Sequence, residues 1–303
     1  MRKFLQDHWP HAAFLLIVFL GGFNAIGVRF TVLELPPFWG ATLRFAPAAL
    51  LFFLFVIILK LPFPRGKALL GAILFGVLNF GFSYAFIYYA VQKVQPGMAQ
   101  VILALMPLFT LIFAISHRQE KFRWFGLLGA LLAFGGITVV FWEQVRTNVP
   151  LFSLLAVALG AACIAEAGVV VKFFPKSHPI TTNAIGMSAG SIILFVMSLL
   201  WHENQVLPEK TITWIALLFL ILFGSGLAFF LVLKILKLWS ASTVSYAFVL
   251  FPFVSLTASA ELSHEALNPV LLVGAALVLT GAVIGIISPQ RKLALQPEPC
   301  PGE

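Results

Sequence analysis

The stretch GMAQVILALMPLFTLIFAISHRQEKFRWFGLLGALLAFGG runs from Gly97 to Gly136. It aligns without gaps with STVSYAFVLFPFVSLTASAELSHEALNPVLLVGAALVLTG when the sequence is shifted by 145 residues. A mid-helix proline, a loop acid and two glycines then share one register, an agreement that composition alone rarely produces. The chain is therefore predicted to contain an internal repeat, whose matched pairs are Pro107 with Pro252, Glu120 with Glu265, Gly129 with Gly274 and Gly136 with Gly281.

The composition places this chain in a membrane. Hydrophobic residues make up 61% of its 303 residues, charged residues make up only 10%, and the mean hydropathy is +1.02. Soluble proteins contain about 25% charged residues, so the chain lies far outside their range. We expect an all-α membrane protein that is surrounded by the lipid bilayer.

Apolar segments long enough to span a bilayer, about 20 residues each, can be marked off along the whole chain. Charges, prolines or polar loops separate them, and the short connections leave no room for a soluble domain. We predict ten transmembrane helices: Pro10 to Thr31, Phe38 to Leu59, Ala68 to Val91, Pro96 to Ser116, Phe122 to Trp142, Leu151 to Phe173, Ile180 to Trp201, Ile212 to Leu236, Ala241 to Ala260 and Pro269 to Ser288.

The basic residues predict the orientation of these spans, because lysine and arginine accumulate in cytoplasmic loops. Fourteen of the 19 basic residues lie in the N-terminal segment, the even-numbered connections and the tail. Both termini are therefore expected to be cytoplasmic.

Each repeat would hold five spans, and this odd number makes the second repeat enter the membrane from the opposite side. The predicted architecture is two inverted five-helix repeats, residues 1–147 and 148–290, followed by a cytoplasmic tail, residues 291–303, that we expect to be disordered. Inverted repeats are typical of secondary transporters, in which substrate binds near the midplane and the two halves open on alternate sides.

Several function classes find no support in the residues. Cys163 lies in an apolar run and Cys300 in the tail, and no cluster of cysteine and histidine has the spacing of metal ligands. The six histidines lie at or beyond span ends, and no GxxxxGK[ST] phosphate loop occurs. We expect no enzyme, no metal and no cofactor. The net charge of +8 comes from scattered membrane-flanking residues, so nucleic acid is not an expected partner.

One carboxylate interrupts the apolar run LLAVALGAACIAEAGVVVKFF, which extends from Leu154 to Phe174. A charge near the middle of a bilayer costs on the order of 3 kcal/mol, so Glu166 is a functional candidate. Three interpretations are open: a central acid that binds a proton or a cationic group, a structural partner of a polar neighbour, and an acid that reaches the cytoplasmic surface. In the first, Glu166 is protonated in one access state and releases its proton in the other.

Other polar residues within the spans are candidates for substrate contact, because buried polar groups need partners. Each of them singly is more often an interhelical hydrogen-bonding group than a ligand. Together they predict a mostly apolar cavity for small neutral or zwitterionic molecules. These binding candidates are Asn24, Asn79, Tyr84, Gln100, Ser225 and Tyr246.

Three further residues are candidates for gating. Pro107 and Pro252 each remove a backbone hydrogen bond and kink their helices, at positions that the repeat relates. Arg44 lies about 9 Å into the second span from its outer end, where it could shape an outer gate. A purely structural kink and an arginine that reaches the surface are the alternatives.

Two motifs are similar to those of a known family. In PPFWGATLRFAPAALLFFL, Arg44 and Phe45 match an Arg-Phe pair before an Ala/Leu run, and the units MPLFTLIFAISHRQEKFRWFGLLGALLAFGGI and FPFVSLTASAELSHEALNPVLLVGAALVLTGAVI repeat a proline, an acid and a small-residue helix. From about Ala12 to Ile287 the chain thus resembles the ten-helix EamA-type members of the drug/metabolite transporter superfamily. The resemblance implies their inverted fold and the transport of small metabolites, without specifying the substrate.

The resemblance has one departure. In the related four-helix multidrug pumps the essential membrane acid lies in the first helix, whereas the first span here has no acid. Glu166 lies in the sixth span instead, where LGAACIAE aligns with LGGFNAIG and sets Glu166 against Gly27.

These features predict a secondary transporter of small metabolites, amino acids first, that works by alternating access, with proton exchange through Glu166 as the candidate driving force. The resemblance alone implies that the direction is export. A cation-selective multidrug exporter that uses Glu166 for both proton and drug is the alternative within transport. A non-coupled channel or a membrane assembly factor is the alternative of another class. The compact chain without an organelle-targeting signal suggests a bacterial inner membrane, and a monomer or a homodimer fits equally.

Overall fold

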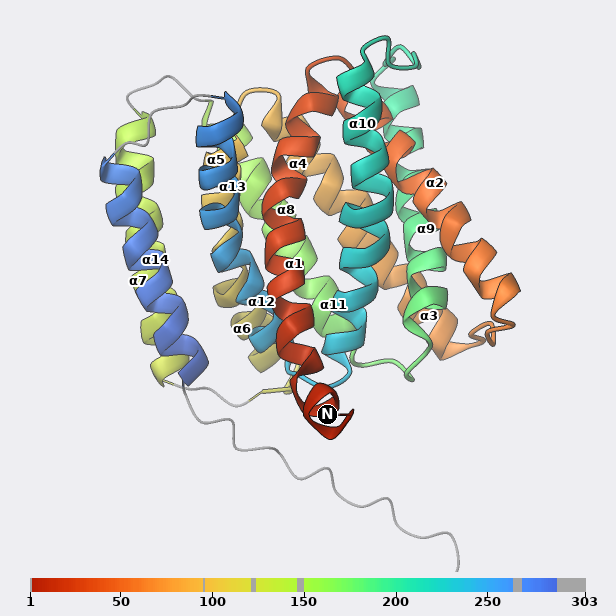
Figure 1. The fold of residues 1–303 in the computed structure, drawn as a ribbon, viewed down its shortest axis with the longest axis horizontal. Helices are drawn as coiled ribbons and strands as arrows, with labels where there is room; N and C mark the ends of the chain where they lie inside the picture. Colours follow the sequence, from red (N-terminus) through yellow and green to blue (C-terminus); the bar gives the residue numbers. More distant parts are fainter. Residues whose placement is uncertain (1, 95, 121–123, 146–149, 264–268, 288–303) are drawn as a thin grey trace, which may run out of the picture.

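The computed structural model describes residues 2–94, 96–120, 124–145, 150–263 and 269–287. Within these ranges the chain is helical apart from turns and connections, and it has no strand. Figure 1 shows the helices packed along roughly one direction, as expected for an all-α membrane protein. The predicted tail, residues 291–303, lies outside the described residues.

The helices follow one another with short connections. Up to residue 145 they are α1 (Arg2–Val32), α2 (Pro37–Ile58), α3 (Lys67–Gly76), η1 (Val77–Phe82), α4 (Ser83–Val91), α5 (Pro96–Leu103), α6 (Met106–Ser116) and α7 (Trp124–Val145). From residue 150 onward they are α8 (Leu151–Val170), α9 (Pro179–Leu200), α10 (Thr211–Phe219), η2 (Leu220–Leu227), α11 (Ala228–Leu236), α12 (Ala241–Ser245), α13 (Ala247–Ser263) and α14 (Pro269–Ile287).

In the described residues, seven helical stretches are long and apolar enough to cross a membrane. Two shorter apolar helices accompany them, Trp124–Gly136 and Ala241–Ser255. Large apolar side chains such as Leu50, Ile57 and Phe152 are more than two-thirds exposed, which suits a surface in contact with lipid. The protein is a multi-pass membrane protein, and the total of ten spans and their inverted arrangement stay predictions.

Two of these stretches change helix type in their middle. Lys67–Val91 consists of α3, η1 and α4 without interruption, and Thr211–Leu236 consists of α10, η2 and α11. The segments η1 and η2 are π-helical, a geometry that is rare and is found often at functional sites. They bring Asn79 and Ser225 into the interior, where both side chains are buried.

The start of α1 marks one end of the bundle, called here the N-terminal end (Figure 1). The ring of Trp239, which follows α11, contacts His11 and Phe14 of α1. The ammonium group of Lys172, which follows α8, donates a hydrogen bond to the Trp239 carbonyl oxygen. The connections from α8 to α9 and from α11 to α12 therefore lie at the N-terminal end.

Two carboxylates tie the opposite end together. Glu203, which follows α9, accepts hydrogen bonds from the backbone N–H groups of Phe38 at 3.2 Å and Trp39 at 2.8 Å. These groups lie in the first turn of α2 and have no partner within their own helix. Glu34 accepts a hydrogen bond from the Thr213 hydroxyl, which lowers the pKa of the Glu34 carboxyl and favours its ionised form.

Glycines allow the closest helix contacts in the bundle. A Cβ added at Gly76 of α3 would overlap the backbone of Gly186 in α9. A Cβ added at Gly281 of α14 would overlap the carbonyl oxygen of Gly129 in α7, and these two helices lie side by side at one edge of the bundle (Figure 1). Small residues at such crossings are typical of helix packing in membranes.

We expect Gly76→Ala to lower the free energy of unfolding by about 1–3 kcal/mol, because the new methyl group must push α9 away. Thermal unfolding of the purified protein in detergent, followed by circular dichroism, measures the effect. Gly168→Ala in α8 is the matched control, since no atom lies within 4 Å of the added Cβ and alanine favours a helix. Equal losses in the two variants would contradict the close contact of α3 with α9.

Candidate functional site

A cavity of about 60 Å³ lies in the interior, between α1, α4, α5, α8 and α13. Its lining is mostly apolar and includes three polar residues, Asn24, Tyr84 and Gln100, all of which are binding candidates from the sequence. This volume holds a few water molecules and is well below the roughly 300–1,000 Å³ of a small-molecule pocket. The cavity must widen before it can hold a metabolite.

Asn24 of α1 and Gln100 of α5 supply polar groups to the lining of the cavity. The Gln100 amide nitrogen donates a hydrogen bond to the Gly21 carbonyl at 3.3 Å, and the amide oxygen has no partner among the described residues. The Asn24 side chain lies beside Gly224 of η2, where an added Cβ would be 3.2 Å from the Asn24 amide nitrogen. A buried oxygen without a donor costs about 1–3 kcal/mol, so Gln100 is suited to accept a hydrogen bond from a ligand.

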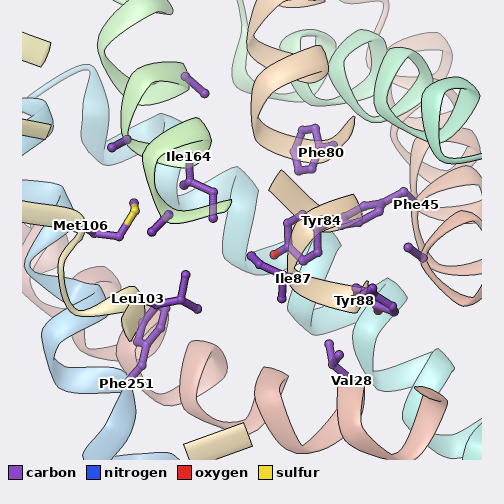
Figure 2. Close-up of a cluster of buried hydrophobic side chains, with 14 of the residues drawn as sticks. Val28, Phe45, Phe80, Tyr84, Ile87, Tyr88, Leu103, Met106, Ile164 and Phe251 are labelled. Carbon is purple, nitrogen blue, oxygen red and sulfur yellow. The ribbon is translucent and has the colours of Figure 1, made fainter. Parts of the chain in front are cut away.

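Tyr84 separates this cavity from a buried cation. Its ring lines the cavity, and Cζ of the Arg44 guanidinium lies 4.9 Å from the ring centre. The ring of Phe45 packs edge-on against the Tyr84 ring, with 4.6 Å between the ring centres. Figure 2 shows the Tyr84 ring between Phe45 and the cavity-lining side chains of Leu103 and Ile164.

Arg44 has a solvent exposure of 0%. Its Nε donates a hydrogen bond to the Ser225 hydroxyl at 2.8 Å, and its Cζ lies 4.7 Å from the ring centre of Phe45. In the part of the chain that the structure describes, neither terminal amino group has a hydrogen-bond partner and no carboxylate lies within ion-pair distance. A buried unpaired charge is strongly unfavourable. The free edge of this guanidinium has the geometry to bind a carboxylate through two parallel hydrogen bonds.

The other three neutral binding candidates, Asn79, Ser225 and Tyr246, lie outside this cavity lining. Asn79 is buried in η1, and its side-chain nitrogen has no partner within the described ranges. Tyr246 lies at the break between α12 and α13, in a separate apolar cluster with Val101 and Val249. The cavity therefore brings together three of the six neutral binding candidates, and Glu166 is not among its lining residues.

The two prolines lie near helix breaks. Pro107 sits in the first turn of α6, directly after the break at residues 104–105, where its missing N–H removes no helical hydrogen bond. Pro252 lies inside α13, and the break before that helix is at Tyr246. Each proline thus follows an interruption of its span, and the gating role of both stays a prediction.

Glu166 pairs with a histidine outside the cavity lining. Its Oε1 lies 2.6 Å from Nε2 of His117, at the end of α6, and the side chains of Glu166 and His117 are 23% and 35% exposed. The Glu166 Oε2 atom is buried and has no partner among the described residues. The amide of Gln119 donates to the Val169 carbonyl at 2.8 Å and fixes the same turn to α8. These contacts hold the end of α6 against α8.

Two of these contacts have no local signal in the sequence. Arg44 and Ser225 are 181 residues apart, and His117 and Glu166 are 49 residues apart. Sequence reasoning identified Arg44, Ser225 and Glu166 singly, since each is a polar residue in an apolar span. It did not identify His117, which follows an apolar run and resembles the other flanking residues.

Comparison with known proteins identifies related chains. The model of the EamA-like transporter family matches residues 8–142 and again residues 151–287. An uncharacterized transporter of Archaeoglobus fulgidus is 27% identical over 89% of this chain and 95% of its own. The uncharacterized inner membrane transporter YedA of Escherichia coli strain K12 is 26% identical over 86% of this chain and 84% of its own. The uncharacterized transporter YoaV of Bacillus subtilis strain 168 is 23% identical over 91% of this chain and 96% of its own.

The fold is also similar to that of a protein known from a crystal structure. The TM-score is 0.70 over 91% of this chain and 95% of that chain, and the sequence identity is 18%, so the likeness concerns the fold alone. The family match, in contrast, extends over most of the sequence. The chain belongs to the EamA-like transporter family.

Proposed function

We propose that this protein is a secondary transporter that exports small carboxylate-bearing metabolites, amino acids first, across the inner membrane by alternating access. The observation that carries the proposal is the buried Arg44 guanidinium behind the cavity wall, whose terminal amino groups have no partner in the described ranges. Membership of the EamA-like family supports transport, and the name of the relative YedA, an inner membrane transporter, supports the location.

The polar groups around the cavity suit the two ends of a zwitterion. The free edge of Arg44 matches a carboxylate, and the unpaired amide oxygen of Gln100 can accept a hydrogen bond from an amino group. Between them the lining is apolar, with Leu103, Ile164 and Phe251 among its members. An amino acid with an apolar side chain fits this combination of groups.

Tyr84 acts as the inner gate in this proposal. Its ring lines the cavity on one side and lies against Arg44 on the other. Rotation of this side chain, together with widening of the cavity, joins the Arg44 amino groups to the space that Asn24 and Gln100 line. The residue that we predicted for an outer gate, Arg44, then serves as the anchor for the carboxylate.

A cation-selective multidrug exporter fits these residues less well. No acid lines the central cavity in the described structure, and a cationic drug there would meet the positive charge of Arg44. Like charges placed together in a binding site select against such ligands. The carboxylate of Glu166 lies outside the lining and is already paired with His117.

Two observations support alternating access between inverted halves. The π-helical segments span residues 77–82 and 220–227, which overlap when the sequence is shifted by 145 residues. The family model also matches the chain twice.

At the end opposite the N-terminus, the hydrogen bonds of Glu34 and Glu203 must break before the cavity can open there.

We expect Arg44→Gln to raise the half-saturation concentration for neutral amino acids by at least about 30-fold. Loss of one partner of a buried charged pair costs about 2–5 kcal/mol, and 2 kcal/mol corresponds to this factor. Counterflow of a panel of amino acids in proteoliposomes measures the change. Arg44→Lys keeps the positive charge and loses the planar guanidinium. Its half-saturation concentration should therefore lie between those of the wild type and Arg44→Gln.

Arg29→Gln is the matched control, because it removes the same charge and, among the described residues, Arg29 makes only a long hydrogen bond of 3.5 Å to the Val91 carbonyl. Thermal unfolding of each variant separates binding from folding. Removal of an unpaired buried charge should leave the melting temperature of Arg44→Gln unchanged or higher. Saturable uptake that Arg44→Gln leaves unchanged would overturn the proposed site, and absence of transport by the wild type would favour a channel or an assembly factor.

Proton coupling through Glu166 is part of the same proposal. The pair with His117 joins two titratable groups, and the buried Oε2 of Glu166 has no donor within the described residues. Movement of α6 against α8 separates the pair and changes where a proton is held. If Glu166 is only a structural residue, its substitution should lower the stability of the protein and leave the coupling of transport to protons unchanged.

We expect Glu166→Gln to abolish the response of amino acid uptake to an imposed pH gradient, since the amide cannot bind a proton. The measurement is uptake by proteoliposomes with and without the gradient. Glu120→Gln is the control, because it makes the same change at the same end of the bundle. If Glu166→Gln keeps the full pH response and only lowers the melting temperature, Glu166 is a structural residue.

A further inference from the structure

A second and larger cavity lies at the N-terminal end of the bundle. Its volume is about 370 Å³, within the range of small-molecule pockets. It is formed by the start of α3, the connection from α8 to α9, the start of α9 and the connection from α11 to α12. Figure 1 shows these segments at the end where α1 begins. It shares no lining residue with the central cavity, so it is a separate site.

All the charged residues that line this pocket are basic. Lys172 and Lys176 belong to the connection from α8 to α9, and Lys237 belongs to the connection from α11 to α12. In the described parts of the chain, none of these lysines has a carboxylate within ion-pair distance. Three positive charges therefore surround one concave space.

Two helix N-termini add to this positive potential. The lining includes Ala68 from the first turn of α3, and Pro179 and Thr182 from the first turn of α9. The N-terminus of a helix carries partial positive charge and unpaired N–H groups, and it favours anions. The hydroxyls of Ser177 and Thr182, which lie 2.6 Å apart, also line the pocket.

The pKa values of the basic groups reflect this crowding. Loss of hydration lowers the pKa of Lys172 to about 8, with attraction to Glu120 acting against this change and repulsion from Lys176 acting with it. Loss of hydration and repulsion from Lys176 also lower the pKa of Lys237. Loss of hydration lowers the pKa of His178, and repulsion from Lys237 lowers it further. A bound anion relieves the repulsion in all three cases.

The rim of the pocket is suited to the membrane surface. Leu238, which lines the pocket, and Phe173, which lies between two lining residues, are 58% and 56% exposed. The Trp239 ring packs against the start of α1, and tryptophan is typical of the boundary between lipid and water. Basic pockets between helices at this depth bind the headgroups of anionic lipids.

We propose that this pocket binds a phosphate-bearing anion, with Lys172, Lys176 and Lys237 around the phosphate group. Lysine binds phosphate as a compact charge, and the positive ends of the two helices add to the attraction for an anion. The anion is the headgroup of an anionic phospholipid or a soluble phosphate ester of similar size, because both present the same group. This site is independent of the substrate proposed for the central cavity.

The test measures the melting temperature of the purified full-length protein in neutral detergent. One arm adds phosphatidylglycerol, with phosphatidylcholine as its control. The second arm adds glycerol 3-phosphate, with sodium chloride at equal ionic strength as its control. The pocket variant is Lys176→Gln/Lys237→Gln, whose side chains are exposed and make no hydrogen bond to the described parts of the chain, so that folding is preserved. The matched variant Lys60→Gln/Lys67→Gln removes two charges from the same end outside the pocket lining.

We expect the phosphate-bearing ligand to raise the melting temperature of the wild type and of Lys60→Gln/Lys67→Gln by roughly 2–5 °C. The pocket variant should lose most of this increase. A response to phosphatidylglycerol alone identifies a lipid headgroup, and a response to glycerol 3-phosphate identifies a soluble ligand. The proposal is wrong if both variants respond equally, or if neither compound stabilises the wild type more than its control does.

Discussion

The position of one fully buried cation governs this structure. Arg44 lies in the second helix of a membrane protein, where an isolated charge is strongly unfavourable, and the surrounding residues stabilise only part of it. Ser225 accepts one hydrogen bond, and the rings of Phe45 and Tyr84 lie within cation–π distance. The terminal amino groups keep their capacity to bind an anion, which is why we place a substrate carboxylate there.

The bundle around Arg44 is arranged to keep that contact in place. The π-helical segment η2 presents Ser225 to α2, and α4 presents Tyr84 from the other side. The close approach of α3 to α9 at Gly76 and Gly186 fixes the helix that continues through η1 into α4. The packing around the site thus also depends on Gly76 and Gly186, which do not line the central cavity.

The membrane-spanning helical character of the fold could be predicted from the sequence, because span length and hydropathy are cumulative signals, whereas the repeat and the orientation stay predictions. Membrane insertion, helical architecture and family membership are all confirmed. The site was harder to predict. Asn24, Tyr84 and Gln100 meet at one cavity, whereas Asn79 and Tyr246 do not, since helix rotation decides which polar side chains converge. The partner of Glu166 is His117, and the contact between them depends on tertiary packing that neither span encodes by itself.

The most direct test of the account is competition by matched pairs of molecules for counterflow in wild-type proteoliposomes. Each pair consists of an amino acid and the amine left after loss of its carboxylate, such as leucine with isoamylamine and phenylalanine with phenethylamine. If Arg44 binds the carboxylate, the amino acid of a pair competes and its amine does not, in line with the loss expected when a charged partner is removed. Equal or stronger competition by the amines would contradict a carboxylate site at Arg44.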